Sequence, residues 1–231
     1  PPHILQDMTV LNANLTALSL EGCLNTIIND KWALAIWFPN VTHLDISGTA
    51  LSSSACTPAN FSPSLTRLNL SSCLKVQGAT IETLATFLKK LEHLELRGLY
   101  RLNDGHLVRI IRANPGLTYF DISALQSPTD TTLLQLQEVC PNLSTLLIKR
   151  CNLTHTALAR IPQYWRSTLT TLNMGISMAP EESILSILTG LKSIRYLFLQ
   201  NALLTKDSRI LSVIAENCPS IESLDLRDCN D

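Results

Sequence analysis

One apolar pattern recurs along the whole chain. It has the form L-x-x-L-x-L, in which other apolar residues replace some of the leucines, and successive copies start 24 to 27 residues apart. Alternating apolar and polar residues predict a short strand with one buried face. One such unit is too small to bury that face alone, so the period indicates stacked copies rather than a closed globule. The nine starts are Leu15, Val41, Leu65, Leu91, Leu117, Leu143, Leu169, Ile194 and Ile221.

Segments with helical spacing of apolar residues connect the strands. The predicted helices span residues 29–38, 79–90, 105–114, 130–140, 154–165, 180–189 and 206–217. Several begin at residue types that favour helix starts, namely Asn103 or Asp104, Thr129, Thr154, Thr205, and Pro180 at a first helical position. The second repeat departs from this scheme, because its segment 52–59 is small and turn-rich and predicts a loop or 3₁₀ turn.

Six of the seven cysteines occupy fixed places in the repeat. Four lie eight residues after a pattern start, and two precede a proline three residues before one; they are Cys23, Cys73, Cys151 and Cys229, and Cys140 and Cys218. Periodic placement is typical of small side chains buried between layers. An odd number of cysteines argues against a fully paired disulfide scaffold. Reduced thiols predict a cytoplasmic or nuclear protein.

These residues resemble the cysteine-containing leucine-rich repeat subfamily. Its pattern, roughly C-P-x-L-x-x-L-x-L-x-x-C before a polar turn and an amphipathic helix, is matched most closely at residues 140–161 and 218–229. The resemblance covers nearly the whole chain, although Thr49, Leu99, Leu125, Ser177 and Ala202 replace the second cysteine. It implies an α/β fold, a leucine-rich-repeat solenoid shaped as an arc or horseshoe. A concave parallel β-sheet and convex helices would form a single domain over residues 1–231.

The resemblance also implies a function. Proteins with this repeat type are often F-box substrate receptors of ubiquitin ligases, and some are bacterial effectors that imitate them. We therefore expect a protein-interaction module that binds a partner, such as a ubiquitin ligase substrate, on its concave face. The alternatives are the repeat region of an effector secreted into a host cytosol and, third, a receptor ectodomain. The residues before Leu15 are too few for an F-box, and both ends look cut, which favours a piece of a longer protein.

Strand positions two, four and six residues after each start should point into the concave groove. Repeats two to five place charged and aromatic residues there, and repeats six and eight add apolar ones. Tyr, Phe and Arg are the residue types that dominate binding hot spots. The charges could instead only solvate the groove, and the apolar residues could pack locally or against another segment. The predicted partner-binding residues are His43, Asp45, Arg67, His93, Glu95, Arg97, Tyr119, Asp121, Leu147, Lys149, Tyr196 and Phe198.

Other kinds of function find little support. His43 and His93 would lie two strands, or about 10 Å, apart, which is a poor start for one metal site. No nucleotide-binding or metalloprotease motif occurs, so neither catalysis nor a cofactor is expected. A net charge of −1 and 16% charged residues argue against nucleic-acid or membrane binding. Glycosylation is not expected, since the sequons at Asn14, Asn40, Asn60, Asn69, Asn142 and Asn152 recur mainly with the repeat.

Overall fold

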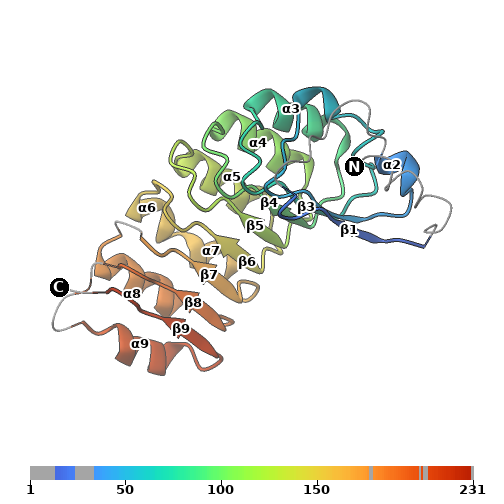
Figure 1. Ribbon diagram of the computed structural model, residues 1–231. Helices are drawn as coiled ribbons and strands as arrows, with labels where there is room; N and C mark the ends of the chain where they lie inside the picture. The colour runs from blue at the N-terminus through green and yellow to red at the C-terminus, as the bar shows by residue number, and fades with distance from the viewer. Residues whose placement is uncertain (1–13, 24–33, 177–178, 203, 205–207, 230–231) are drawn as a thin grey trace. The chain divides into compact units, whose positions relative to one another are not determined.

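The computed structural model describes residues 14–23, 34–176, 179–202, 204 and 208–229. The chain forms two compact units, divided between Leu117 and Thr118. Each unit alternates short strands with helices or turns along the chain, and in each the helices lie on one side of the strands (Figure 1). None of the described helices has the length and apolarity that crossing a bilayer requires.

Every predicted pattern contains one three-residue strand. Each strand begins two residues after the start of its pattern, so the predicted register is confirmed. Within each unit, neighbouring strands pair in parallel and in chain order, with equivalent repeat positions opposite each other. The strands are β1 (Ala17–Ser19), β2 (His43–Asp45), β3 (Arg67–Asn69) and β4 (His93–Glu95) in the first unit, and β5 (Tyr119–Asp121), β6 (Thr145–Leu147), β7 (Thr171–Asn173), β8 (Tyr196–Phe198) and β9 (Ser223–Asp225) in the second.

Most connecting segments form the predicted helices. The helices are α2 (Leu34–Trp37), α3 (Gly78–Phe87), α4 (Asp104–Ala113), α5 (Asp130–Val139), α6 (His155–Leu158), α7 (Ile161–Trp165), α8 (Glu181–Gly190) and α9 (Ile210–Asn217). In the second repeat a 3₁₀ turn, η1 (Ser53–Ala55), replaces the helix as predicted. Thr205 and the first part of the predicted helix 29–38 lie outside the described residues.

Two helix predictions need correction. The segment 154–165 forms two short helices instead of one, because Pro162 has no N–H to donate to the carbonyl of Leu158. Pro180 is the N-cap of α8 and not its first helical residue. The predicted caps Asn103, Thr129 and Thr154 are confirmed, since the side chain of each accepts a backbone N–H from the first turn of its helix.

The core is built from the central residue of each strand and the apolar faces of the helices. In β2 to β8 this central residue is at most 4% exposed. The residues on either side of it point to the opposite face of the sheet, as strand geometry requires. We call this opposite face, made of the positions two, four and six residues after each pattern start, the outward face.

Each turn after a strand contains one residue in the left-handed region, seven residues after the pattern start. In three repeats this residue is glycine, namely Gly22, Gly48 and Gly98, with φ between 70° and 74°. In the other six it is a residue with a side chain, at Ser72, Ala124, Arg150, Ile176, Asn201 and Asp228, with φ between 57° and 64°. Side chains other than Gly, Asn and Asp adopt this conformation only at a cost. The same turn therefore forms regardless of local preference, which shows that the stacking of the repeats imposes it.

Cysteine thiols link successive repeats. The Sγ atoms of Cys73, Cys151 and Cys229 donate to the carbonyls of Ile46, Ile122 and Leu199, each in the preceding repeat, at 3.0 to 3.1 Å. Cys23 belongs to the first repeat of the described chain and is exposed, and Cys151 and Cys229 are only partly buried. The prediction that the periodic cysteines are buried is therefore confirmed for Cys73, Cys140 and Cys218 and wrong for Cys23. All seven cysteines are free thiols, in agreement with the prediction against a disulfide scaffold.

The close contact between α7 and α8 predicts the effect of one substitution. A Cβ atom on Gly190 would lie 2.3 Å from Cβ of Pro162, whose ring cannot move away freely. Gly190→Ala should therefore lower the free energy of unfolding by about 1–2 kcal/mol, although alanine favours helices. Urea denaturation followed by circular dichroism measures the change. Ser186→Ala, on the exposed side of the same helix, serves as the control and should be neutral; equal effects would show that α7 and α8 are not packed this closely.

Candidate partner-binding face

The outward face of the first unit carries an open pocket of about 390 Å³. Its polar lining comes from β1 to β4 and contains five of the predicted residues, namely His43, Asp45, Arg67, His93 and Glu95. Strand pairing places Arg67 between His43 and His93, as predicted. Arg97 lies beyond the end of β4 and is exposed. The structure therefore brings together the first-unit members of the predicted site.

Local hydrogen bonds engage most of these charged groups. One carboxylate oxygen of Asp45 accepts the backbone N–H of Ser47 at 2.8 Å, and the other accepts the amide of Asn69 at 3.1 Å. Nε2 of His93 lies 2.8 Å from a carboxylate oxygen of Glu95. This supports the alternative that part of the charge only stabilises the surface. Arg67 and Arg97 make no ion pair with any described residue.

The residue four positions after each pattern start, which we call the fourth position, has a structural role. Its polar character in the sequence did not reveal this role. In six strands the residue there is Asp, Asn or Ser, and its side-chain oxygen accepts the backbone N–H two residues later. This bond closes the turn that follows the strand. The residues are Ser19, Asp45, Asn69, Asp121, Asn173 and Asp225. Their recurrence at one repeat position was the signal available in the sequence.

Three strands lack this turn-closing residue. Glu95 occupies this repeat position in β4, where it pairs with His93, while Leu147 and Phe198 occupy it in β6 and β8. Neither Leu147 nor Phe198 can accept a hydrogen bond with its side chain, and both are partly exposed on the outward face. By register, each is the neighbour of Asn173 on the strand between them. The second unit therefore replaces a turn-forming residue with an apolar side chain at two nearby places.

Three other predicted residues of the second unit differ in how much of their side chain is exposed. Asp121 is only 5% exposed and accepts the N–H of Ser123 at 2.7 Å, so its carboxylate offers little surface to a partner. Tyr119 and Lys149 are partly exposed.

Tyr196 lies in a small polar cluster at the end of the second unit. Its hydroxyl donates to Oε2 of Glu222 at 2.7 Å, and the Arg195 guanidinium binds Oε1 of the same carboxylate. The hydrogen bonds from Tyr196 and Arg195 lower the pKa of Glu222, while the bond to Glu222 raises the pKa of Tyr196. The tyrosine hydroxyl is therefore held in place, and its ring remains on the outward face.

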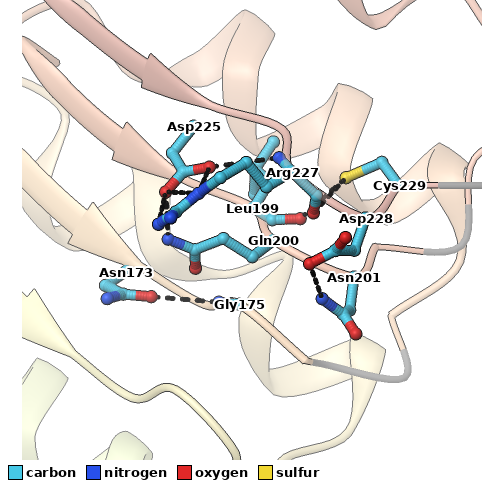
Figure 2. A network of polar contacts seen from close by, with 9 residues as sticks. All are labelled: Asn173, Gly175, Leu199, Gln200, Asn201, Asp225, Arg227, Asp228 and Cys229. Carbon is cyan, nitrogen blue, oxygen red and sulfur yellow. Dashed lines mark hydrogen bonds and ion pairs between the residues drawn. The ribbon is translucent and has the colours of Figure 1, made fainter.

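A second network joins the turns of the last two repeats, and the bond between Asn173 and Gly175 of the repeat before them lies beside it (Figure 2). Asp225 accepts Nε2 of Gln200 and the Arg227 guanidinium, which lowers the pKa of the Asp225 carboxyl. Gln200 in turn lies over Gly175, where a Cβ atom would come within 2.3 Å of its Oε1. No residue of this network belonged to the predicted site. Its bonds order the surface beside Phe198.

The structure gives little basis for metal or thiol chemistry at this face. The described residues contain no group of three His, Cys, Asp or Glu side chains placed to hold a metal ion. Burial raises the pKa of Cys56 and Cys151 to about 12 and also raises the pKa of Cys73 and Cys218, so these thiols stay protonated at neutral pH. A protonated thiol is a poor nucleophile.

The asparagines of the six sequons differ in their exposure to solvent. Asn14, Asn40, Asn142 and Asn152 are exposed, whereas Asn60 is 2% exposed and donates to the carbonyl of Ala55. Asn69 is partly buried and bonded to Asp45 and Ser71. The expectation that the sequons carry no glycans stays a prediction.

Comparison with solved structures identifies the fold. The chain is similar to Rad7 in the crystal structure of the yeast Rad7 and Elc1 complex, with a TM-score of 0.63 and 21% identity, over 97% of this chain and 57% of that one. It is also similar to TLR13 in the TLR13–ssRNA13 complex, with a TM-score of 0.62 and 18% identity, over 92% of this chain and 32% of that one. The chain thus spans less than two thirds of either structure. No model of a known protein family matches the sequence. None of the curated proteins matches it either. The parallel sheet, the turns and the helices together make this a leucine-rich-repeat fold.

Proposed function

We propose that the outward face binds a partner protein and that Leu147, Phe198 and Tyr196 form the apolar centre of the binding surface. One observation carries the proposal. At the fourth pattern position, six repeats use a side chain that closes the following turn, whereas β6 and β8 present a partly exposed leucine and phenylalanine. Local structure favours Asn or Asp at this position, so local structure does not explain the two apolar residues.

The surroundings of these side chains suit a protein surface. Leu147 and Phe198 flank Asn173, so their backbones lie about 10 Å apart, enough for one partner side chain between them. Oδ1 of Asn173 is bound to the N–H of Gly175, while its Nδ2 makes no hydrogen bond to a described residue and can donate to a partner. Buried apolar anchors beside fixed polar groups are typical of interface hot spots.

Within this proposal, the cysteine-containing repeat pattern supports a finer role in recognising substrates for an F-box type ubiquitin ligase. Rad7, which shares the fold, was crystallised in complex with Elc1, so this fold occurs in protein complexes. The free, mostly buried thiols support a cytoplasmic or nuclear location for such a receptor. Co-purification of the full-length protein with an Skp-type adaptor tests this finer role.

The binding face can be tested without disturbing the fold. In the double variant Leu147→Asn and Phe198→Asn, each asparagine matches the residue found at the same position in β3 and β7. Its side chain can close the turn as Asn69 and Asn173 do, so stability should be kept or raised. Loss of each anchor should weaken partner binding by about thirtyfold, the equivalent of about 2 kcal/mol. Affinity purification from cells of the source organism, quantified by mass spectrometry, would show which partners the variant loses.

A control variant separates the outward face from the helical side. Glu138→Asn changes an exposed residue of α5 and should leave every partner bound. A double variant that keeps its fold and the wild-type set of partners would refute the outward face as the binding surface.

A further inference from the structure

A second surface of the first unit combines exposed apolar side chains with unpaired positive charge. Leu74 is 58% exposed and Tyr100 is 55% exposed, which makes them two of the most exposed large apolar residues described. Both stand nine residues after a pattern start, in neighbouring repeats whose strands β3 and β4 pair in register. They therefore lie next to each other beyond the ends of the strands, in the turns and not on the outward face.

The turns that carry these residues are tied together. The N–H of Gly48 donates to the carbonyl of Ser71 at 2.8 Å, and the N–H of Ser72 donates to the carbonyl of Arg97 at 2.9 Å. Beside Leu74 lies an open pocket of about 360 Å³, lined by Gly48, Thr49, Ala50, Ser72, Leu74 and Lys75. The surface is thus a bonded platform with room for an apolar side chain.

The charge on this platform has one sign. Lys75, Arg97 and Arg101 are exposed, and none of them makes an ion pair with a described residue. No Asp or Glu occurs between residues 70 and 81 or between residues 96 and 103; the acids that follow these two segments are Glu82, in α3, and Asp104, at the start of α4. The Arg101 guanidinium lies 5.7 Å from the centre of the Tyr100 ring. Cationic and apolar groups therefore alternate over a short distance.

We infer that this turn edge, made of Leu74, Lys75, Arg97, Tyr100 and Arg101, docks an acidic segment of a partner protein that carries an apolar anchor residue. The anchor occupies the pocket beside Leu74, and carboxylates face the three cations. Charge complementarity of this kind accelerates association and selects among partners. Arg97 also belongs to the outward face, but the turn edge and the apolar centre around Leu147, Phe198 and Tyr196 share no residue, so the inference does not depend on the proposed function.

Two other classes of ligand fit less well. Nucleic acid binds through many phosphate contacts, whereas this chain offers three cations here and has a net charge of −1. A membrane surface requires a broader apolar face than two side chains and a pocket provide. An acidic protein segment with one anchor matches both the small apolar area and the sign of the charge.

Synthetic peptides test the inference directly. The probe is a short fluorescent peptide in which pairs of glutamates alternate with leucines, and binding to the intact chain is measured by fluorescence anisotropy. The charge-reversal pair Lys75→Glu and Arg101→Glu should weaken binding about tenfold. The pair Leu74→Ser and Tyr100→Ser should weaken it about thirtyfold. All four side chains are exposed, so these variants should keep the fold.

Control peptides and a control variant show whether binding requires both the leucines and the glutamates of the peptide. A peptide with alanine in place of leucine should bind much more weakly, and a peptide with lysine in place of glutamate should not bind. The outward-face variant Leu147→Asn with Phe198→Asn should bind the acidic peptide as the wild type does, so failure of one proposal remains distinct from failure of the other. Unchanged affinity in both turn-edge variants, or no saturable binding of the acidic peptide, overturns the inference. Tighter binding to single-stranded RNA or to anionic lipid vesicles overturns it as well.

Discussion

Replacing Trp165 with alanine is expected to lower the free energy of unfolding of the second unit by about 4 kcal/mol. Trp165 is the last residue of α7 and is fully buried, and it is among the largest buried side chains described. Its Nε1–H donates to the carbonyl of Cys140, at the end of α5, at 2.8 Å. Removal of the ring leaves a large cavity between two successive repeats, and their packing cannot collapse without moving both helices. Urea denaturation followed by circular dichroism measures the loss.

A conservative variant separates the ring from its hydrogen bond. Trp165→Phe keeps most of the buried apolar surface and removes only the N–H donor. The carbonyl of Cys140 still accepts the N–H of Leu143 at 3.4 Å, so this variant should cost only about 1–2 kcal/mol. If the alanine variant were no less stable than the phenylalanine variant, Trp165 would not fill the space between these repeats.

The repeat pattern predicted the fold well because its signal depends on burial. Leucines such as Leu146 and Leu172 recur at one position because each must lie in the shared core, where both are fully buried. The strand register follows from the same requirement, since equivalent positions pair from repeat to repeat. The break between α6 and α7 was less apparent, although Pro162 was visible in the sequence. Apolar residues continue at helical spacing on both sides of Pro162, so the spacing alone predicts one helix.

The candidate site was predicted less well, because outward-pointing residues serve two purposes that look alike in a sequence. Asp45 and Asp121 were predicted to bind a partner, yet each closes its own turn, and Asp121 is almost fully buried. Only hydrogen-bond geometry distinguishes a turn-closing carboxylate from one that awaits a ligand. The left-handed turn residue was missed for a different reason. Its identity varies from Gly98 to Ile176, so no residue type marks the position.

The difference between turn-closing residues and residues that close no turn is the best evidence that the outward face binds a partner. A polar residue at the fourth position is explained by the turn that it closes, and it needs no partner. Leu147 and Phe198 close no turn with their side chains, and each exposes apolar surface, which costs free energy in water. Residues that depart from the local structural preference of their position are therefore better candidates for binding than residues that are merely exposed.

Replacing Asn114 with alanine is expected to lower the free energy of unfolding by about 3 kcal/mol, although no charge or large side chain is lost. Asn114 is fully buried and occupies the repeat position held elsewhere by Cys140 and Cys218. Its Nδ2 donates to the carbonyls of Leu88 and Ile110 at 3.1 and 3.0 Å, and its Oδ1 accepts the N–H of Leu91 at 2.9 Å.

The cost arises from the groups that remain after the substitution. The Leu88 carbonyl lies at the end of the preceding repeat and the Leu91 N–H at the start of the next strand pattern, and alanine would leave both buried without the amide that binds them. Asn217→Ala is the matched control, because Asn217 also ends a helix but its side chain makes one bond, to the carbonyl of Val213 at 3.1 Å. That variant should cost about 1 kcal/mol or less. Equal losses in the two variants, measured by urea denaturation, would show that the Asn114 amide does not bridge adjacent repeats. A larger loss at Asn114 would show that adjacent repeats depend on this buried amide as well as on apolar packing.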